Sequence, residues 1–128
     1  MAKTEDLDGV TLDVYTPQEV KEMFDRNEIV LIDVRTPQEY AFEHIPGAML
    51  FPMSSFDPMK LPSQEGKRIV FHCGSGMRSY RTAAIGAAAG LSRVAHMDGG
   101  FGAWKSAGLP YLGIDPATGA MIRKPAGA

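Results

Sequence analysis

The chain has 128 residues, of which 45% are hydrophobic and 22% are charged, and its formal net charge at pH 7 is -2. This length suits one domain with one core, and the composition excludes an intrinsically disordered chain. Acidic and basic residues nearly balance, so no basic surface for nucleic acid is indicated and we expect no nucleic-acid partner.

The first residues carry the acidic side chains Glu5, Asp6 and Asp8 and lack the apolar segment of a secretion signal. No stretch reaches about 18 uninterrupted apolar residues, the length that indicates a transmembrane helix. We therefore expect a cytoplasmic protein with no membrane partner.

The first half of the chain alternates strand and helix signals. A short strand is expected over Thr11–Val14, and Thr16–Glu19 then supplies the capping residue, first-turn proline and closing glutamate of a helix start. This helix ends near Asn27. Ile29–Val34 follows as a continuous apolar, β-branched run, which is typical of a central parallel strand. Thr36–Glu39 repeats the capping pattern and predicts a second, brief helix.

The alternation continues in the second half of the chain. Ala48–Phe51 is predicted to be a short buried strand, and residues 52–67 a surface connection with at most one helical turn. Ile69–Phe71 and Val94–Met97 are two further predicted strands. Between them we expect a helix over Arg78–Gly90, whose alanines permit close packing against a sheet.

The sequence signals for the last elements are weaker. A short helix is expected over Phe101–Trp104, and residues 113–128, rich in Gly, Ala and Pro, have no periodic apolar pattern. We predict one domain over residues 1–112 and a C-terminal extension over residues 113–128. Five strands that alternate with helices predict an α/β fold with a mostly parallel sheet, whose ligand site lies at the carboxyl ends of the strands.

One such strand end carries the residue on which the functional interpretation depends. Cys73 is the only cysteine, which excludes an intramolecular disulfide, a two-cysteine redox pair and a cysteine-based zinc site. In a turn from strand to helix, successive backbone N–H groups can point inward, and Gly74 and Gly76 carry no side chain that would block them. A thiolate enclosed by such donors has a pKa below its free value of about 8.5.

The rest of this loop suits an anion. Arg78 adds a permanent planar charge that fits a sulfonate, sulfate or phosphate, and Ser75 and Ser79 can donate hydroxyl hydrogen bonds. Met77 could contact the substrate or a partner at the rim. Two reactions fit this arrangement: the thiolate takes a sulfur atom from a donor such as thiosulfate, or it attacks phosphorus and forms a phosphocysteine.

Other polar residues have structural or supporting interpretations. Asp33 and Arg35 follow a central strand and could form a structural ion pair or support the cysteine loop. His44 could line the pocket mouth or fix the following turn. His72 alternates with Cys73 along a strand and so points to the opposite face, which makes it a poor base for the thiol. Together with His96 these scattered histidines predict no metal site.

The sequence resembles the rhodanese family over most of the chain between about Val10 and Leu112. The resemblance is carried by four stretches, which are Leu31–Arg35 with Glu39 and Tyr40, His44–Ala48, Cys73–Ser79, and Asp98–Trp104 with Ala107–Pro110. It implies a five-stranded, mostly parallel sheet flanked by helices on both faces. It also implies a persulfide on Cys73, with substrate held by the amides of Gly74–Ser79 and by Arg78.

In that family a six-residue loop accompanies sulfur transfer and a seven-residue loop accompanies action on phosphate or arsenate. Cys73 through Arg78 is six residues. We therefore expect an enzyme of the thiosulfate:cyanide sulfurtransferase type, with no metal or organic cofactor, a small anionic sulfur donor and a thiophilic acceptor that could be a protein. Gly74 and Glu43 depart from the family pattern, in which arginine and glycine are common at these positions. The alternatives are a non-catalytic binding or regulatory module and, third, a cysteine-dependent phosphatase.

Overall fold

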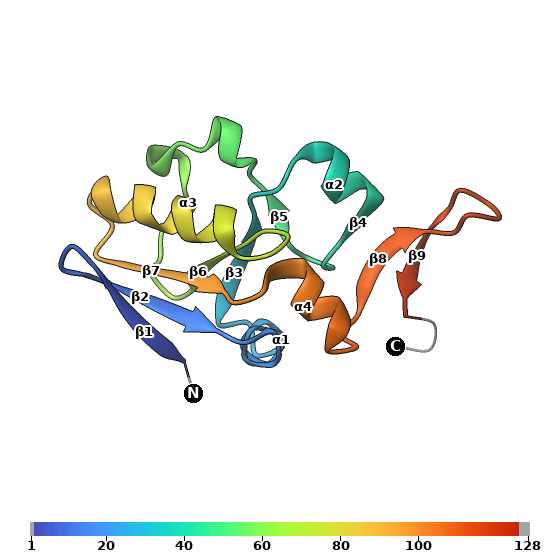
Figure 1. Cartoon of the computed structure of the whole chain (residues 1–128), viewed down its shortest axis with the longest axis horizontal. Helices are drawn as coiled ribbons and strands as arrows, with labels where there is room; N and C mark the ends of the chain where they lie inside the picture. Colours follow the sequence, from blue (N-terminus) through green and yellow to red (C-terminus); the bar gives the residue numbers. More distant parts are fainter. Residues whose placement is uncertain (1, 126–128) are drawn as a thin grey trace.

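A computed structural model describes residues 2–125, whose main sheet is covered by helices (Figure 1). The sheet has six strands in the order β1-β2-β7-β6-β3-β5. Their bounds are Lys3–Leu7 (β1), Val10–Tyr15 (β2), Ile29–Asp33 (β3), Met49–Leu50 (β5), Arg68–His72 (β6) and Arg93–Met97 (β7). All neighbouring pairs are parallel except β1 with β2. The predicted α/β fold with a mostly parallel sheet is confirmed.

The antiparallel strand β1 adds to the five parallel strands that the sequence predicts. It reads Lys-Thr-Glu-Asp-Leu, and its first four residues are exposed. Because a strand of exposed polar side chains carries no hydrophobic alternation, the sequence gives no signal for it. Its place depends on backbone pairing with β2, in register from Lys3 opposite Val14 to Leu7 opposite Val10.

Helices flank both faces of the sheet, as predicted. They are Pro17–Asp25 (α1), Pro37–Phe42 (α2), Met77–Ala88 (α3) and Gly100–Ser106 (α4). Both predicted capping boxes are present: Thr16 and Thr36 each accept a hydrogen bond from the backbone of the glutamate three residues on, which accepts one in return. The connection over residues 52–67 contains two 3-10 turns, Met53–Ser55 and Pro58–Lys60, one more than expected.

Alternation along the central strands separates two apolar clusters. On one face Leu31 and Val70 pack with α1 and α4, where Trp104 is almost fully buried. On the other face Ile32 and Phe71 pack with Ala83 of α3 and with apolar residues of the 52–67 connection. Each central strand is therefore buried on both sides, which accounts for its continuous apolar sequence.

The C-terminal residues form a hairpin that the sequence did not indicate. Strands Tyr111–Ile114 (β8) and Met121–Lys124 (β9) are antiparallel, and β8 also pairs with Glu43–His44 (β4) in a second sheet of order β4-β8-β9. Strand β8 crosses the predicted division between residues 112 and 113. In β8, Tyr111 packs edge to face against Phe101 of the core, whereas Met121 and Ile122 of β9 remain exposed, so β9 depends on backbone pairing with β8.

The fold places the cysteine loop at the carboxyl end of a central strand. Strand β6 ends at His72, the loop follows, and α3 begins at Met77. The first turn of α4 packs directly on this loop, where the Phe101 amide donates to the Cys73 carbonyl at 2.8 Å and the Gly102 amide donates to the Gly74 carbonyl at 3.0 Å. Two unpaired amides of a helix start are thereby satisfied by the loop.

This contact requires glycine at position 100. Gly100 has φ +61°, and an added Cβ would lie 2.6 Å from the Cys73 carbonyl oxygen. We predict that Gly100→Ala lowers the free energy of unfolding by about 1–3 kcal/mol more than Gly108→Ala does, because it adds a backbone clash to the strain. Gly108 is the matched control, with φ +75° and open space at the Cβ position. Urea unfolding measures both, and equal losses would contradict the close approach.

Candidate active site

The sulfur of Cys73 is buried beneath its loop and held by neutral donors. The Gly76 amide donates to Sγ at 3.1 Å, and Sγ lies 3.6 Å from the hydroxyl oxygen of Ser79. Burial raises the pKa of the Cys73 thiol, but hydrogen bonds from the Ser79 amide and hydroxyl and from the Gly76 and Ser75 amides outweigh it and lower the pKa below its usual value. The loop is therefore built to hold a thiolate.

The direction of one of these amides, that of Ser75, follows from the contact with α4. A trans peptide unit points its N–H opposite to its C=O. The Gly74 carbonyl accepts from α4, so the Ser75 amide of the same peptide unit faces the sulfur side of the loop. The amide cradle that the glycines indicated is present.

Ser79 connects the sulfur to a histidine of β7. Its hydroxyl oxygen lies 2.9 Å from Nδ1 of His96, and the hydroxyl also lies 3.2 Å from the Gly76 carbonyl oxygen, to which it can donate. Burial lowers the pKa of His96, although the Asp98 and Glu5 carboxylates act in the opposite direction. Sequence reasoning considered His96 only as a metal ligand, but alternation from Val94 along β7 already places it on the face covered by α3.

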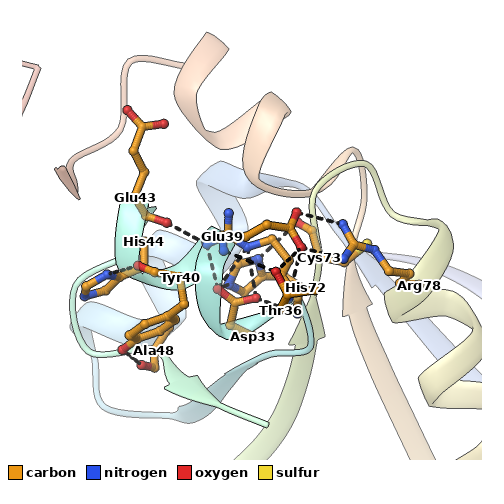
Figure 2. Close-up of polar contacts among 11 residues, drawn as sticks. Asp33, Thr36, Glu39, Tyr40, Glu43, His44, Ala48, His72, Cys73 and Arg78 are labelled. Carbon is orange, nitrogen blue, oxygen red and sulfur yellow. Dashed lines mark hydrogen bonds and ion pairs between the residues drawn. The ribbon is translucent and has the colours of Figure 1, made fainter. Parts of the chain in front are cut away.

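Arg78 is held by an acidic partner. Its two terminal nitrogens donate to the two carboxylate oxygens of Glu39 at 2.7 and 3.0 Å, so its side chain points toward the start of α2 (Figure 2). The hydrogen bonds from Arg78 lower the pKa of the Glu39 carboxyl to about 2, in spite of partial burial. A Cβ at Gly74 would lie 3.2 Å from Arg78 Nη2, so the ion pair lies close to the loop entrance. The anion-binding charge expected of Arg78 is already compensated.

Asp33 and Arg35 form a buried ion pair on the face of the main sheet opposite to the side chain of Cys73. Arg35 Nη2 lies 2.8 Å from Asp33 Oδ2 and also donates to the Glu43 carbonyl at 2.7 Å. His72 lies against this pair, with Nε2 3.6 Å from Asp33 Oδ2, and its Nδ1 lies 3.2 Å from the Cys73 carbonyl oxygen. Burial lowers the pKa of His72 more than Asp33 raises it. The predicted structural ion pair is present and reaches the cysteine loop through His72 and through Phe101, over whose ring Arg35 lies at 4.6 Å and whose amide donates to the Cys73 carbonyl.

His44 lies in the short strand β4, which follows α2 directly and precedes the turn at Pro46 and Gly47. Its Nδ1 is 2.8 Å from the Tyr40 carbonyl oxygen, and its ring stacks on the Tyr40 ring with centroids 3.9 Å apart. The Tyr40 hydroxyl donates to the Ala48 carbonyl at 2.6 Å. Figure 2 shows this group pointing away from Cys73, which favours the turn-fixing interpretation over a place at the pocket mouth.

Two pockets flank the loop. One, of about 340 Å³, is lined by Ser75, Gly76, Met77 and His96 among others, and Met77 is 64% exposed at its edge. The other, of about 400 Å³, includes Arg35, Thr36 and Arg78. Within residues 2–125 no three His, Cys, Asp or Glu side chains are arranged to hold a metal ion. None of the helices described is long and apolar enough to cross a membrane.

Comparisons with known proteins find a matching family model and several similar proteins. A family model described as "Rhodanese-like domain" matches residues 16–107. An uncharacterized protein of Synechocystis is 35% identical over 108 residues, which are 84% of this chain and 60% of that protein. A "Sulfurtransferase" of Allochromatium vinosum is 35% identical over 88 residues, 69% of this chain and 82% of that protein. A "Thiosulfate sulfurtransferase GlpE" of Pseudoalteromonas translucida is 31% identical over 86 residues, 67% of this chain and 82% of that protein.

A solved structure from Rhodopseudomonas palustris is also similar. It has a TM-score of 0.61 and 30% sequence identity, and the match covers 74% of this chain and 82% of that one. That protein is described as one of unknown function and a possible tyrosine phosphatase.

The buried ion pair of Asp33 and Arg35 should matter far more for stability than an exposed one. We predict that Arg35→Met lowers the free energy of unfolding by about 3–5 kcal/mol, because Asp33 is left buried without its counter-ion. Arg93→Met is the control, since Arg93 pairs with Asp13 through a side chain that is 57% exposed, and should cost about 1 kcal/mol or less. Urea unfolding at neutral pH separates the two, and similar losses would contradict the bracing role of Arg35.

Proposed function

The chain belongs to the rhodanese family, whose domain model matches residues 16–107, and from this membership we propose that the protein is a sulfurtransferase. Cys73 is the nucleophile and carries sulfane sulfur as a persulfide. The observation that carries the proposal is the sulfur of Cys73 within hydrogen-bonding reach of the Gly76 amide and the Ser79 hydroxyl, in a loop of six residues.

The first half of the reaction charges the cysteine. The Cys73 thiolate attacks the outer sulfur of thiosulfate, a new sulfur–sulfur bond forms, and the bond within thiosulfate breaks so that sulfite leaves with its electron pair. The terminal sulfur of the persulfide then carries the negative charge. Backbone N–H groups of Gly74–Ser79 stabilise this charge, as they stabilise the thiolate before it.

The second half discharges the sulfur. A thiophilic acceptor, such as cyanide, a small thiol or a cysteine of an acceptor protein, attacks the terminal sulfur. The sulfur–sulfur bond breaks and the Cys73 thiolate leaves with the electron pair. The hydrogen bonds that lower the pKa of Cys73 make this thiolate a better leaving group, so the same donors support both halves.

Thiosulfate is proposed as a donor because a relative carries that name and because the loop suits a small anion. The donor must approach beside an arginine that Glu39 already neutralises. Arg78 therefore binds thiosulfate only in competition with Glu39. Thiosulfate and a phosphate monoester are both dianions near neutral pH, so the pairing of Arg78 with Glu39 weakens the binding of either one.

Sulfur loading can be tested directly. Treatment with thiosulfate should add one sulfur atom to the intact mass, and addition of cyanide should release thiocyanate and remove the added mass. Cys73→Ser should lose both signals while it remains folded. A folded wild-type protein that shows neither signal with thiosulfate or another sulfane donor would contradict sulfur transfer. Hydrolysis of p-nitrophenyl phosphate that depends on Cys73 would favour the phosphatase instead.

The competition between Glu39 and the donor gives a second prediction. Glu39→Gln keeps a residue that can close the capping box but removes its charge, so Arg78 becomes available to thiosulfate. We expect KM for thiosulfate to fall about fivefold, equivalent to about 1 kcal/mol, with a smaller gain at high salt. Glu19→Gln makes the same change in the capping box of α1 and should leave KM unchanged. An unchanged or higher KM for Glu39→Gln would contradict the competition.

A further inference from the structure

A line of three side chains leads from the sulfur into the interior between α3 and β7. It runs from Cys73 Sγ to Ser79 Oγ at 3.6 Å and from Ser79 Oγ to His96 Nδ1 at 2.9 Å. All three residues are buried, and the exposed fraction of His96 is 5%. We propose that His96 is a positioning residue, which through Ser79 directs a hydroxyl hydrogen at the sulfur and so favours the thiolate of Cys73.

The effect depends on the single hydroxyl hydrogen of Ser79. Its hydroxyl has one hydrogen but three neighbours that can accept it, namely Cys73 Sγ, the Gly76 carbonyl and His96 Nδ1. When Nδ1 of His96 carries a proton, it donates to Ser79 Oγ and no longer competes for the hydroxyl hydrogen. When Nδ1 is bare, it accepts that hydrogen and draws it away from the sulfur. The protonation of Nδ1 therefore decides whether the thiolate receives the hydrogen bond from the Ser79 hydroxyl.

Formation of the thiolate and protonation of Nδ1 support each other. A negative sulfur attracts the Ser79 hydroxyl hydrogen, which leaves the oxygen lone pairs free to accept from His96. The neutral tautomer with hydrogen on Nδ1 and the imidazolium both supply this donor. The hydrogen bonds then run from the Nδ1–H of His96 to Ser79 Oγ and from the Ser79 O–H to Cys73 Sγ, so both donors are used.

The surroundings of His96 suit this role. Burial keeps the ring mostly neutral at pH 7, because it lowers the pKa of His96. Asp98 and Glu5 of β1 favour a proton on the ring, and Arg81 of α3 lines the same pocket. Tyr80 packs its ring edge to face with the imidazole at 5.9 Å between centroids. These contacts hold the ring orientation that aims Nδ1 at Ser79.

The other two histidines do not serve the sulfur in this way. His72 contacts Cys73 only at the carbonyl oxygen, and its ring lies with Asp33 on the opposite face of the sheet. His44 contacts the Tyr40 carbonyl. The proposal rests on Cys73 being the nucleophile of the proposed function, but it concerns the pKa of the thiol and can be measured without sulfur transfer.

The test is the pH dependence of the rate at which iodoacetamide alkylates Cys73. His96→Phe removes the Nδ1–H that donates to Ser79 Oγ. We expect the midpoint of the pH–rate profile to rise by about one pH unit, so that alkylation at pH values below the midpoint slows about tenfold. His96→Asn offers an amide N–H near the position of Nδ1 and should bring the midpoint most of the way back to the wild-type value. Tyr80→Phe is the control, since it keeps the ring against His96, and should follow the wild-type profile.

A double-mutant cycle tests whether His96 acts through Ser79. Ser79→Ala should raise the midpoint at least as much as His96→Phe, and the two changes together should raise it no further than Ser79→Ala alone. Additive shifts, or a His96→Asn profile that matches His96→Phe, would overturn the proposal. So would a His96→Phe profile that coincides with wild type.

The outcome is separate from that of the sulfur-loading test. If the midpoints move as expected but thiosulfate adds no sulfur, His96 still sets the thiol pKa and the proposed function is wrong. If sulfur is loaded while the midpoints coincide, the proposed function holds and the role of His96 is overturned. Circular dichroism and urea unfolding of each variant confirm that the comparison is made on folded protein.

Discussion

The site depends on the contact between the cysteine loop and the first turn of α4. Two amides of α4 have no acceptor within the helix and instead donate to the carbonyls of Cys73 and Gly74. Because these carbonyls face α4, amides of the loop are turned toward the sulfur. The contact is possible because Gly99 and Gly100 adopt φ +72° and +61°, which bring the backbone of α4 against the loop. A structural contact on one side of the loop thus creates the chemical environment on the other.

The groups that donate hydrogen bonds to the sulfur are dipoles, and two guanidinium groups near the loop have acidic partners. Arg35 is paired with Asp33 and Arg78 with Glu39, so the charges of these two arginines are compensated. The sulfur is instead held by N–H and O–H groups, which stabilise one diffuse negative charge well. A thiolate and a persulfide each carry such a charge at sulfur. This match connects the observed electrostatics with the proposed chemistry.

Features encoded by neighbouring residues were predictable from the sequence, and features that depend on distant pairing were not. The capping boxes, the central strands and the amide cradle each depend on a few consecutive residues, such as Thr36 with Glu39. Strands β1 and β9 carry exposed side chains and form through backbone pairing, so neither has a hydrophobic pattern. The pairing of Arg78 with Glu39 joins separate elements, and its partner already had a capping role that explained its presence. For His96 the only sequence signal was the alternation of side chains along β7, which placed it near α3.

Neighbouring residues at the end of β6 serve two different networks because a strand alternates its faces. His72 turns to the Asp33 and Arg35 pair, where burial keeps it neutral, while Cys73 turns to α3 and Ser79. The first network fixes the strand end, since Arg35 also holds the Glu43 carbonyl next to β8. The second acts on the thiol. The two networks meet at Cys73, whose carbonyl oxygen lies 3.2 Å from His72 Nδ1 while its sulfur lies 3.6 Å from Ser79 Oγ, so the backbone and the side chain of one residue face different networks.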